Sequence, residues 1–414
     1  MSHPSKELTG IEGSELTSKR IVLCITGSVS AYKAPNVARE LMRHGADVHA
    51  VMTPGAQKII HPNLMEFSTG NPVVTELTGK IEHVAFTTGE GKADLILIAP
   101  ATANTIGKIA SGIDDTPVTS YVSSALGAGI AILIAPAMHD TMLTHPLIQD
   151  NVERLRKAGV AFIPPKMEEG KAKLPEPEEI LRAVIARLTV KDMAGLKFLI
   201  TGGPTAEPID ATRVVTNRSS GKMAVALADA AAVRGASVTL VLGPSTTGPQ
   251  PDVRVVNVRT AREMYGAVRR ELANRKYDLM VAAAAVSDYA PRIISGGKIP
   301  SSRFKTISLK LQRTPKIIDY VKKASPKTFL VIFKAEYGVG QAELVRRARL
   351  RMKEAKADMA IVNDVSRDDI GFGSDHNEVM VVESSGKATA LSKAPKGVIA
   401  DQILTAALRH VRRR

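Results

Sequence analysis

The sequence predicts an α/β protein made of two tandem Rossmann-like domains, each a three-layer unit with a mainly parallel sheet. Buried strand patterns alternate with amphipathic helix patterns along most of the chain, as expected where crossover helices connect parallel strands. Two of these patterns open alike, as IVLCITGS from Ile21 and as KFLITGGP from Lys197, and each runs from a buried strand into a glycine turn. The 414 residues also suit two domains of roughly 200 residues each.

Composition points away from the membrane and secreted classes. Hydrophobic residues make up 44% of the chain, and no apolar run approaches the roughly 18 residues of a membrane span. Residues 1–19 are polar, lack the apolar core of a signal peptide and are expected to form a disordered tail. The single cysteine, Cys24, excludes an intrachain disulfide framework and fits a reducing compartment. We therefore expect a cytoplasmic protein without a membrane partner.

The net charge of +15 raises nucleic-acid binding as an alternative function. Against it, the chain has no Trp, only 4% aromatic residues, and basic residues spread along its whole length. No recognition-helix, zinc-finger or RNA-recognition signature is present. Anionic small molecules account for part of the positive charge, and we expect no nucleic-acid partner.

In the first half, strands are predicted at residues 21–26, 47–52, 95–99 and 130–135, and an amphipathic helix at 34–44. Polar motifs follow three of these strands: TGS at 26–28, PATANT at 100–105 and PAMH at 136–139. Parallel α/β sheets bind their ligands at the carboxyl ends of the strands, so these motifs lie where a ligand is expected. A charged, proline-bounded loop at 164–177 and a helix at 178–188 complete this half.

The second half follows a predicted linker at residues 189–194, which sets domain limits of 20–190 and 191–414. Helices are expected at 223–232 and 397–414, and two weaker strand candidates, 306–311 and 379–382, indicate an antiparallel addition. The main strands are predicted at 197–200, 237–242, 279–284, 329–333 and 359–362.

Residues 196–232 are the most informative stretch of the chain. A strand, a glycine turn and then a helix expose backbone N–H groups and a helix dipole to an anion. The loop between strand and helix suits phosphates and an activated carboxylate, because it gathers Glu207, Asp210, Arg213, Arg218, Asn217 and Lys222. A tight turn beside a solvated loop would explain the glycine pair taken alone.

This stretch resembles the phosphopantothenate–cysteine ligase half of the bifunctional coenzyme A biosynthesis flavoproteins, whose pattern is roughly GGT-x-E-x-ID-x-x-R-x-x-TN-x-SSGKMG. The chain departs from that pattern by an extra Pro204 and by Ala224 in place of the last glycine. The resemblance extends over nearly everything after residue 19, with the motifs in the family's order. It implies an archaeal-like variant of the family that lacks one cysteine in its first half.

The motifs ITGSVSAYK, PATANTIGK and PAMHDTM resemble the flavoprotein cysteine decarboxylases, which bind FMN. His83 matches the region of their catalytic histidine, where an imidazole can orient substrate or move a proton near neutral pH. Taken singly, these residues read as helix caps, turn residues or surface histidines. The resemblance implies FMN contacts from Gly27, Ser28, Thr53, Thr102 and Asn104, and substrate contacts from His139, which replaces an asparagine, from Met142 and from Lys171.

The implied reaction of this half is decarboxylation of 4'-phosphopantothenoylcysteine to 4'-phosphopantetheine. In the family, the flavin oxidises the thiol to a thioaldehyde, carbon dioxide leaves, and the reduced flavin returns the ene-thiolate to a thiol. Many members carry a proton-donating cysteine in a Gly-rich flap, but the matching loop at 167–173 has none. Cys24 lies within a strand and is expected in the core, which leaves Glu168, Glu169 and Lys171 as candidate donors.

The second half is implied to join cysteine to 4'-phosphopantothenate with CTP, through an acyl-cytidylate and with Mg²⁺. Asn217 matches the catalytic residue at the acyl intermediate, Lys298 the lysine of the loop over the triphosphate, and Arg213 a substrate contact. Asp288 matches the residue that meets nucleotide and Mg²⁺. The nucleotide-site matches are Gly202, Gly203, Ser219, Ser220, Gly221, Lys222, Ala282, Ala283, Ala284, Asp288, Lys298, Pro315, Lys316, Ile317, Ile318, Phe333, Arg351 and Lys356.

Three questions stay open in this interpretation. KIPSS after Gly297, together with Lys334, resembles the eukaryotic ATP-using ligase, so ATP is an alternative to CTP. The missing flap cysteine leaves a ligase-only enzyme as the alternative function, with the first half a flavin-binding scaffold or regulator. The family's flavin halves form trimers and its ligase halves form dimers. That implies a homo-oligomer, with a dodecamer as one arrangement.

Overall fold

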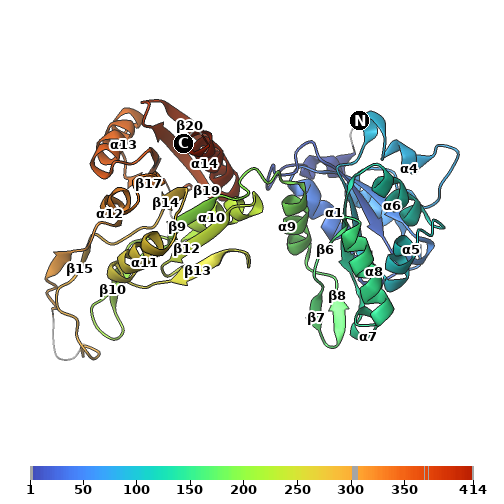
Figure 1. The fold of residues 1–414 in the computed structure, drawn as a ribbon, viewed down its shortest axis with the longest axis horizontal. Coiled ribbons are helices and arrows are strands. Elements are labelled where there is room, and N and C mark those ends of the chain that lie inside the picture. The colour runs from blue at the N-terminus through green and yellow to red at the C-terminus, as the bar shows by residue number, and fades with distance from the viewer. Residues whose placement is uncertain (1–2, 301–305, 368, 372, 413–414) are drawn as a thin grey trace. The chain divides into compact units, whose positions relative to one another are not determined.

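The structure, a computed structural model, describes residues 3–300, 306–367, 369–371 and 373–412. The chain forms two units, residues 1–189 and 190–414 (Figure 1). In each unit a mainly parallel sheet has a separate apolar cluster on each of its two faces. The predicted pair of three-layer α/β domains is therefore confirmed.

The five-stranded sheet of the first unit has the order β2-β1-β3-β4-β6, and all its neighbours are parallel. Its strands are continuous apolar runs because helices cover both faces. β1 lies between β2 and β3, so the turn after β1 sits where the strand order reverses, the usual ligand position in such sheets. The strands are β1 (Arg20–Ile25), β2 (Asp47–Met52), β3 (Leu95–Ala101), β4 (Ala131–Pro136) and the unpredicted β6 (Ala161–Phe162).

Helices cover the two faces of this sheet with distinct apolar sets. Leu41 and Ile180 belong to the cluster under α1 and α9, whereas Ile106, Val122 and Val152 belong to the one under α5, α6 and α8. The helices are α1 (Ala34–Arg43), α5 (Ala103–Ala110), α6 (Pro117–Gly127), α8 (Pro146–Lys157) and α9 (Pro177–Leu188). Shorter helices are η1 (Pro4–Leu8), η2 (Val29–Lys33), α2 (Pro54–Gln57), α3 (Pro62–Thr69), α4 (Glu82–Ala85), η3 (Gly89–Gly91) and α7 (Asp140–Leu143).

The second unit has an eight-stranded sheet of order β13-β12-β9-β14-β17-β18-β19-β20. Neighbours are parallel from β13 to β18, and β19 and β20 add antiparallel strands, which confirms the predicted addition at 379–382. β9 lies between β12 and β14, so its glycine turn again marks a reversal of strand order. The strands are β9 (Lys197–Gly202), β12 (Ser237–Leu242), β13 (Arg254–Asn257), β14 (Leu279–Ala282), β17 (Phe329–Glu336), β18 (Met359–Asp364), β19 (His376–Glu383) and β20 (Ala388–Pro395).

Two helices pack on one face of this sheet and three on the other. Leu227 of α10 (Lys222–Val233) and Ile403 of α14 (Lys396–Val411) share one apolar cluster. The opposite cluster lies under α11 (Ala261–Asn274), α12 (Ile317–Ala324) and α13 (Gln341–Ala355). The guanidinium of the buried Arg234 donates to Asp401 Oδ1 at 3.0 Å and so joins the end of α10 to α14.

Small antiparallel sheets lie outside the two main ones, and they correct two predictions. Of the predicted strand at 306–311, only Leu311 lies in a strand, because this segment pairs over just three residues, β15 (Tyr289–Pro291) with β16 (Leu311–Arg313). The predicted loop at 164–177 contains a hairpin that turns at Glu169 and Gly170, both at positive φ. The other short strands are β5 (Met138–His139), β7 (Lys166–Glu168), β8 (Lys171–Lys173), β10 (Ala206–Pro208) and β11 (Val214–Thr216).

The N-terminal segment differs from the expected disordered tail over its described residues, 3–19. Leu16 is fully buried in the apolar cluster that also contains Leu41 of α1. The carboxylate of Glu15 lies 2.9 Å from His44 Nδ1, and Glu12 pairs with Arg43 at 3.3 Å. Ion pairs and backbone hydrogen bonds hold most of this segment, and only isolated side chains such as Leu16 are buried. A segment held in this way has a polar sequence, which is why the sequence pattern predicted a disordered tail. Within the described part of the chain, none of the helices has both the length and the apolar character needed to cross a bilayer.

We predict that the first unit becomes less stable as pH rises through neutrality, through His44. The hydrogen bond to Glu15 raises the pKa of His44 above its usual value, against the opposing effect of burial. A raised histidine pKa adds stability below the unfolded value, about 6.5, and that stability is lost as pH rises through the folded value. Urea unfolding of the first unit at low and high pH should show this loss in the wild type and less of it in His44→Gln. The exposed His61→Gln serves as control, and an equal pH dependence in all three proteins would contradict the assignment.

Candidate functional site

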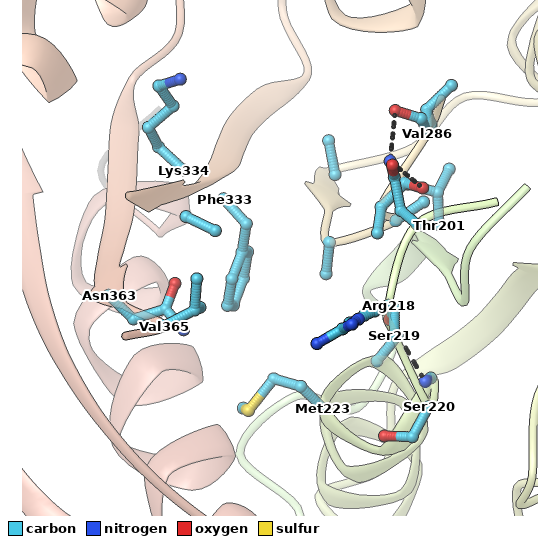
Figure 2. Close-up of a pocket in the computed structure, with 18 of the residues that line it drawn as sticks. Thr201, Arg218, Ser219, Ser220, Met223, Val286, Phe333, Lys334, Asn363 and Val365 are labelled. Carbon is cyan, nitrogen blue, oxygen red and sulfur yellow. Dashed lines mark hydrogen bonds between the residues drawn. The ribbon is translucent and has the colours of Figure 1, made fainter. Parts of the chain in front are cut away.

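A pocket of about 640 Å³ opens at the carboxyl ends of the central strands of the second unit. Thr201 of β9, Ala282 of β14 and Phe333 of β17 all line it. Figure 2 shows Arg218, Ser219 and Met223 on the side of α10, facing Phe333, Asn363 and Val365 across the cavity. The pocket thus lies at the reversal of strand order, where the topology predicts a ligand.

Asn217 fixes the loop over this pocket. Its side-chain amide donates to the carbonyl oxygens of Ala285 and Val286, at 3.1 and 3.2 Å. The neighbouring Thr205 hydroxyl accepts the backbone N–H of Ser287 at 3.0 Å. Two loops that lie far apart in the sequence are thereby fastened together at the mouth of β9 and β14.

The pocket brings together most of the residues that the sequence assigns to the ligase site. They are Asn217, Ser219, Ser220, Gly221, Lys222, Ala282, Ala283, Ala284, Asp288, Pro315, Lys316, Ile317, Ile318, Phe333 and Arg351. Charges are paired within it: Lys316 Nζ lies 2.6 Å from Asp288 Oδ1, and Arg351 lies 2.6 Å from Asp319. These cations can exchange a carboxylate partner for a phosphate oxygen without being left unpaired.

Some described residues that the sequence assigns to the ligase site do not line the pocket. They are Gly202, Gly203, Arg213, Lys298 and Lys356. Gly202 has a packing role instead, because a Cβ there would lie 2.3 Å from Cβ of Ala224 on α10. Gly203 has a positive φ of 74° and forms the turn itself. Lys356 is exposed at the end of α13.

Arg213 and the loop that carries Lys298 are held together through the carboxylate of Asp210. Arg213 Nη1 donates to Asp210 Oδ2 at 2.6 Å and to the carbonyl of Ile299 at 3.2 Å. The backbone N–H of Ile299 also donates to Asp210, at 3.1 Å. These backbone hydrogen bonds, with those of Thr212 and Arg213, hold the pKa of Asp210 well below its usual value. Asp210 therefore stays ionised and ties the loop that presents the exposed Lys298.

Sequence reasoning did not single out Lys396, a buried lysine that also lines the pocket. It is the first residue of α14 and directly follows β20. A lysine immediately before an apolar helix pattern, where a capping side chain is usual, is the sequence signal that could have found it.

In the first unit, the ends of β1 and β3 are joined at the predicted flavin loops. The hydroxyl of Thr26 donates to the carbonyl of Pro100 at 2.8 Å and accepts the N–H of Thr102 at 3.0 Å. A Cβ on Gly27 would lie 3.1 Å from the backbone of Gly55, a contact so tight that the backbone would have to shift by a few tenths of an ångström. The result is a cradle of backbone at the strand ends, which fits a phosphate group.

The side chains around this cradle divide into two groups. Thr53 and Thr102 cap short helices, because their hydroxyls accept N–H groups of Ala56 and Thr105 at 3.2 and 3.3 Å. Ser28 has no such capping bond, and Asn104 is exposed in the first turn of α5. Ser28 and Asn104 are therefore the side chains available to a ligand.

His83 lies in a strained segment. Ile81, two residues earlier, adopts a left-handed conformation with φ of 46°, which costs a β-branched residue about 1–3 kcal/mol. His83 Nδ1 is buried and has no hydrogen-bond partner among the described residues. Backbone strain and an orphaned buried nitrogen are typical of a position that meets a ligand.

The hairpin of β7 and β8 pairs with β5, and its register places Lys171 directly opposite His139. Hydrogen bonds from Lys166 and Lys173 lower the pKa of Glu168, and one from Lys173 lowers that of Glu169. Both carboxylates are thus poor proton donors at neutral pH. Met142 is exposed on α7, directly after β5.

Known proteins resemble both units. A family described as "Flavoprotein" matches residues 9–189, and one described as "DNA/pantothenate metabolism flavoprotein C-terminal domain" matches residues 193–410. The chain is 49% identical over 383 residues to the coenzyme A biosynthesis bifunctional protein CoaBC of Thermococcus kodakarensis, covering 92% of this chain and 93% of that protein. For the protein of that name in Methanocaldococcus jannaschii the identity is 37%, over 92% and 91%. A crystal structure of the C-terminal domain of such a protein gives a TM-score of 0.45 at 30% identity, covering 54% of this chain and 98% of that one.

We predict that Gly202→Ala destabilises the second unit by about 1–3 kcal/mol, because the new methyl group would overlap Ala224 at the start of α10. Gly248→Ala is the matched control, since no atom lies within 4 Å of a Cβ at that position. Urea unfolding measures the difference in the free energy of unfolding, and hydrogen exchange of the α10 amides shows whether the loss of stability is centred on that helix. Equal stability of the two variants would show that α10 does not approach β9 as closely as described.

Proposed function

This chain belongs to the family of bifunctional coenzyme A biosynthesis flavoproteins, and we infer that it ligates cysteine to 4'-phosphopantothenate and decarboxylates the product. The observation that carries this inference is that both family domains are present in one chain, with high identity to bifunctional relatives along nearly its whole length. The ligase pocket and the flavin cradle lie in different units, so each activity has its own site. We propose a cytoplasmic location, where its single thiol stays reduced.

For the ligase we propose CTP as the activating nucleotide. The carboxylate attacks the α-phosphorus and releases pyrophosphate, and the amine of cysteine then displaces CMP from the acyl-cytidylate. Phe333 and the residues from Pro315 to Ile318 form the wall that suits the base. Asp288 would supply one carboxylate oxygen to Mg²⁺, an ion that usually takes its other oxygens from phosphates and water. We assign Asn217, which lines the pocket, to the reacting phosphate, and we assign the same role to Lys298, whose loop would have to move toward the pocket.

For the decarboxylase we propose FMN, whose phosphate fits the glycine cradle at Gly27 with Ser28 and Asn104 beside it. When bound, the flavin supplies the two-electron oxidation and return that make loss of carbon dioxide possible. Among the chain's own residues, His83 offers a free ring nitrogen, and His139 offers an imidazole to the substrate carboxylate. Lys171, whose register partner is His139, is the proposed proton donor in place of the absent cysteine.

We also propose a homo-oligomer, with trimers of the flavin unit and dimers of the ligase unit, and a dodecamer as one arrangement. The hairpin segments of the ligase unit present apolar side chains to solvent, including Ile293, Ile294 and Leu311. Exposed apolar residues gathered on one segment are a usual mark of a protein interface.

We predict that the purified chain carries a flavin absorbance spectrum and releases pyrophosphate only with 4'-phosphopantothenate, cysteine and a nucleotide all present. Parallel reactions with CTP and ATP identify the preferred nucleotide. Carbon dioxide should then be released from the ligation product, which separates the bifunctional enzyme from a ligase with an inactive flavin domain. A colourless protein would contradict the first activity, and the absence of pyrophosphate would contradict the second.

We predict that Lys171→Gln slows decarboxylation by about 10²-fold, the usual effect of losing a positioned proton donor. Ligation should be unchanged, because the ligase pocket lies in the other unit. Lys166→Gln on the outer strand of the same hairpin is the control, and it should have little effect on either reaction. A normal rate of carbon dioxide release in Lys171→Gln would exclude this lysine as the donor.

A further inference from the structure

Arg218 differs from the other cations of the ligase pocket because its charge is not committed to a neighbour. The committed cations are Lys222, Lys316, Lys334 and Arg351, each within 3.2 Å of a carboxylate oxygen, and Lys396, which donates to a backbone carbonyl. The side chain of Arg218 forms no ion pair or hydrogen bond with any residue that the structure describes. Its guanidinium is therefore available to a ligand.

The backbone on both sides of Arg218 is held in place. Asn217 donates its side-chain amide to two backbone carbonyls of the facing loop, at 3.1 and 3.2 Å, and this occupies its donors. On the other side, the carbonyl of Ser220 accepts the hydroxyl of Ser245 at 2.9 Å. The side chain of Arg218 thus starts from a fixed point, and it extends into the cavity toward Phe333 (Figure 2).

The ligation needs a place for a second carboxylate, that of the incoming cysteine. In an α-amino acid a single carbon atom separates the amine from the carboxylate. When the amine attacks the acyl carbon, the carboxylate must therefore lie close beside the reacting centre. Asn217, which we assign to that centre, directly precedes Arg218 in the chain. A carboxylate brought there from water needs a cation or several N–H donors to replace its hydration.

Arg218 suits this carboxylate better than it suits the nucleotide. A planar guanidinium can donate two parallel hydrogen bonds to the two oxygens of a carboxylate. The phosphates of the nucleotide have cations elsewhere, because Lys316 and Arg351 lie at α12 and α13, on one face of the sheet. Arg218 comes from the loop before α10, which packs on the other face.

We propose that Arg218 binds the α-carboxylate of cysteine and so holds its amine at the acyl carbon. This inference rests on the ligase function proposed above. The bond from the amine nitrogen to the acyl carbon forms as the bond from that carbon to the phosphate oxygen breaks. CMP leaves, the proton of the amine passes to solvent, and Arg218 keeps its own charge throughout. Arg218 is then a residue of substrate selection that favours an α-amino acid over a simple amine.

The test uses cysteamine, which is cysteine without its carboxylate, and follows pyrophosphate release by the full-length, flavin-loaded enzyme. The wild type should have a much higher kcat/KM for cysteine than for cysteamine. Arg218→Gln should reduce this preference about tenfold or more, mainly through a higher KM for cysteine, because a charge-assisted pair of hydrogen bonds is lost. The KM values for the nucleotide and for 4'-phosphopantothenate should not change. Arg262→Gln is the matched control, an exposed arginine of α11 outside the pocket lining.

The ratio of the two kcat/KM values separates a contact with cysteine from general damage to the pocket, since damage would slow both amines alike. An unchanged ratio in Arg218→Gln would overturn the proposal, as would a wild type that uses both amines equally well. A rise in the KM for the nucleotide or for 4'-phosphopantothenate, with the KM for cysteine unchanged, would assign Arg218 to a phosphate and overturn it too. Absence of pyrophosphate release by the wild type with all three substrates would instead contradict the ligase function itself.

Discussion

The close approach of a backbone turn to a helix N-terminus, at the end of each central strand, is the constraint on which both sites depend. In the second unit Gly202 lets α10 lie against β9, and in the first unit Gly27 lets the turn after β1 lie against Gly55. A side chain at either position would push these elements apart. With glycine there, the turn lies directly against the start of the next helix, an arrangement that favours an anion. The sheets and the helices on both faces supply the rigidity that holds this arrangement.

The strands, glycine turns and helices of the two main sheets were predictable because each is encoded by residues close together in the sequence. The glycine turns, the strands before them and the helix after Lys222 each have a hydrophobic period and a breaker within a few residues. The small sheets were harder, because β5, β7 and β8 pair over only two or three residues and their sequence is dominated by charge. The same limit explains the N-terminal segment, whose burial rests on Leu16 and on pairs such as Glu15 with His44, 29 residues apart.

The candidate site was predictable where motifs name its residues and not where the fold alone assembles them. Asn217, Asp288 and Phe333 lie in the motifs that match the family and also line the pocket. Lys396 has no motif of this kind, and it reaches the pocket because β20 runs antiparallel to β19 and returns the chain beside α10. Lys298 shows the converse. It lies in a matching motif, yet it is exposed on a loop tied to Asp210 and is not part of the described lining. The role proposed for Lys298 at the triphosphate would require its loop to move toward the pocket, and a local sequence motif does not encode such a movement.

The hairpin of the flavin unit shows how a lost residue limits what can replace it. A proton donor must still hold its proton at neutral pH when the substrate arrives, and it must not be bound by a stronger partner. Glu168 and Glu169 fail the first condition because lysines of the same hairpin stabilise their ionised forms. Lys173 fails the second because it lies within 3.2 Å of both of these carboxylates. Lys171 forms no ion pair among the described residues, unlike the other charged side chains of the hairpin. Its cross-strand position opposite His139 puts it beside the group that would receive the substrate's carboxylate. Of the three candidates Glu168, Glu169 and Lys171, the charge pattern of the hairpin therefore favours Lys171 as the proposed donor, because both carboxylates are paired with lysines.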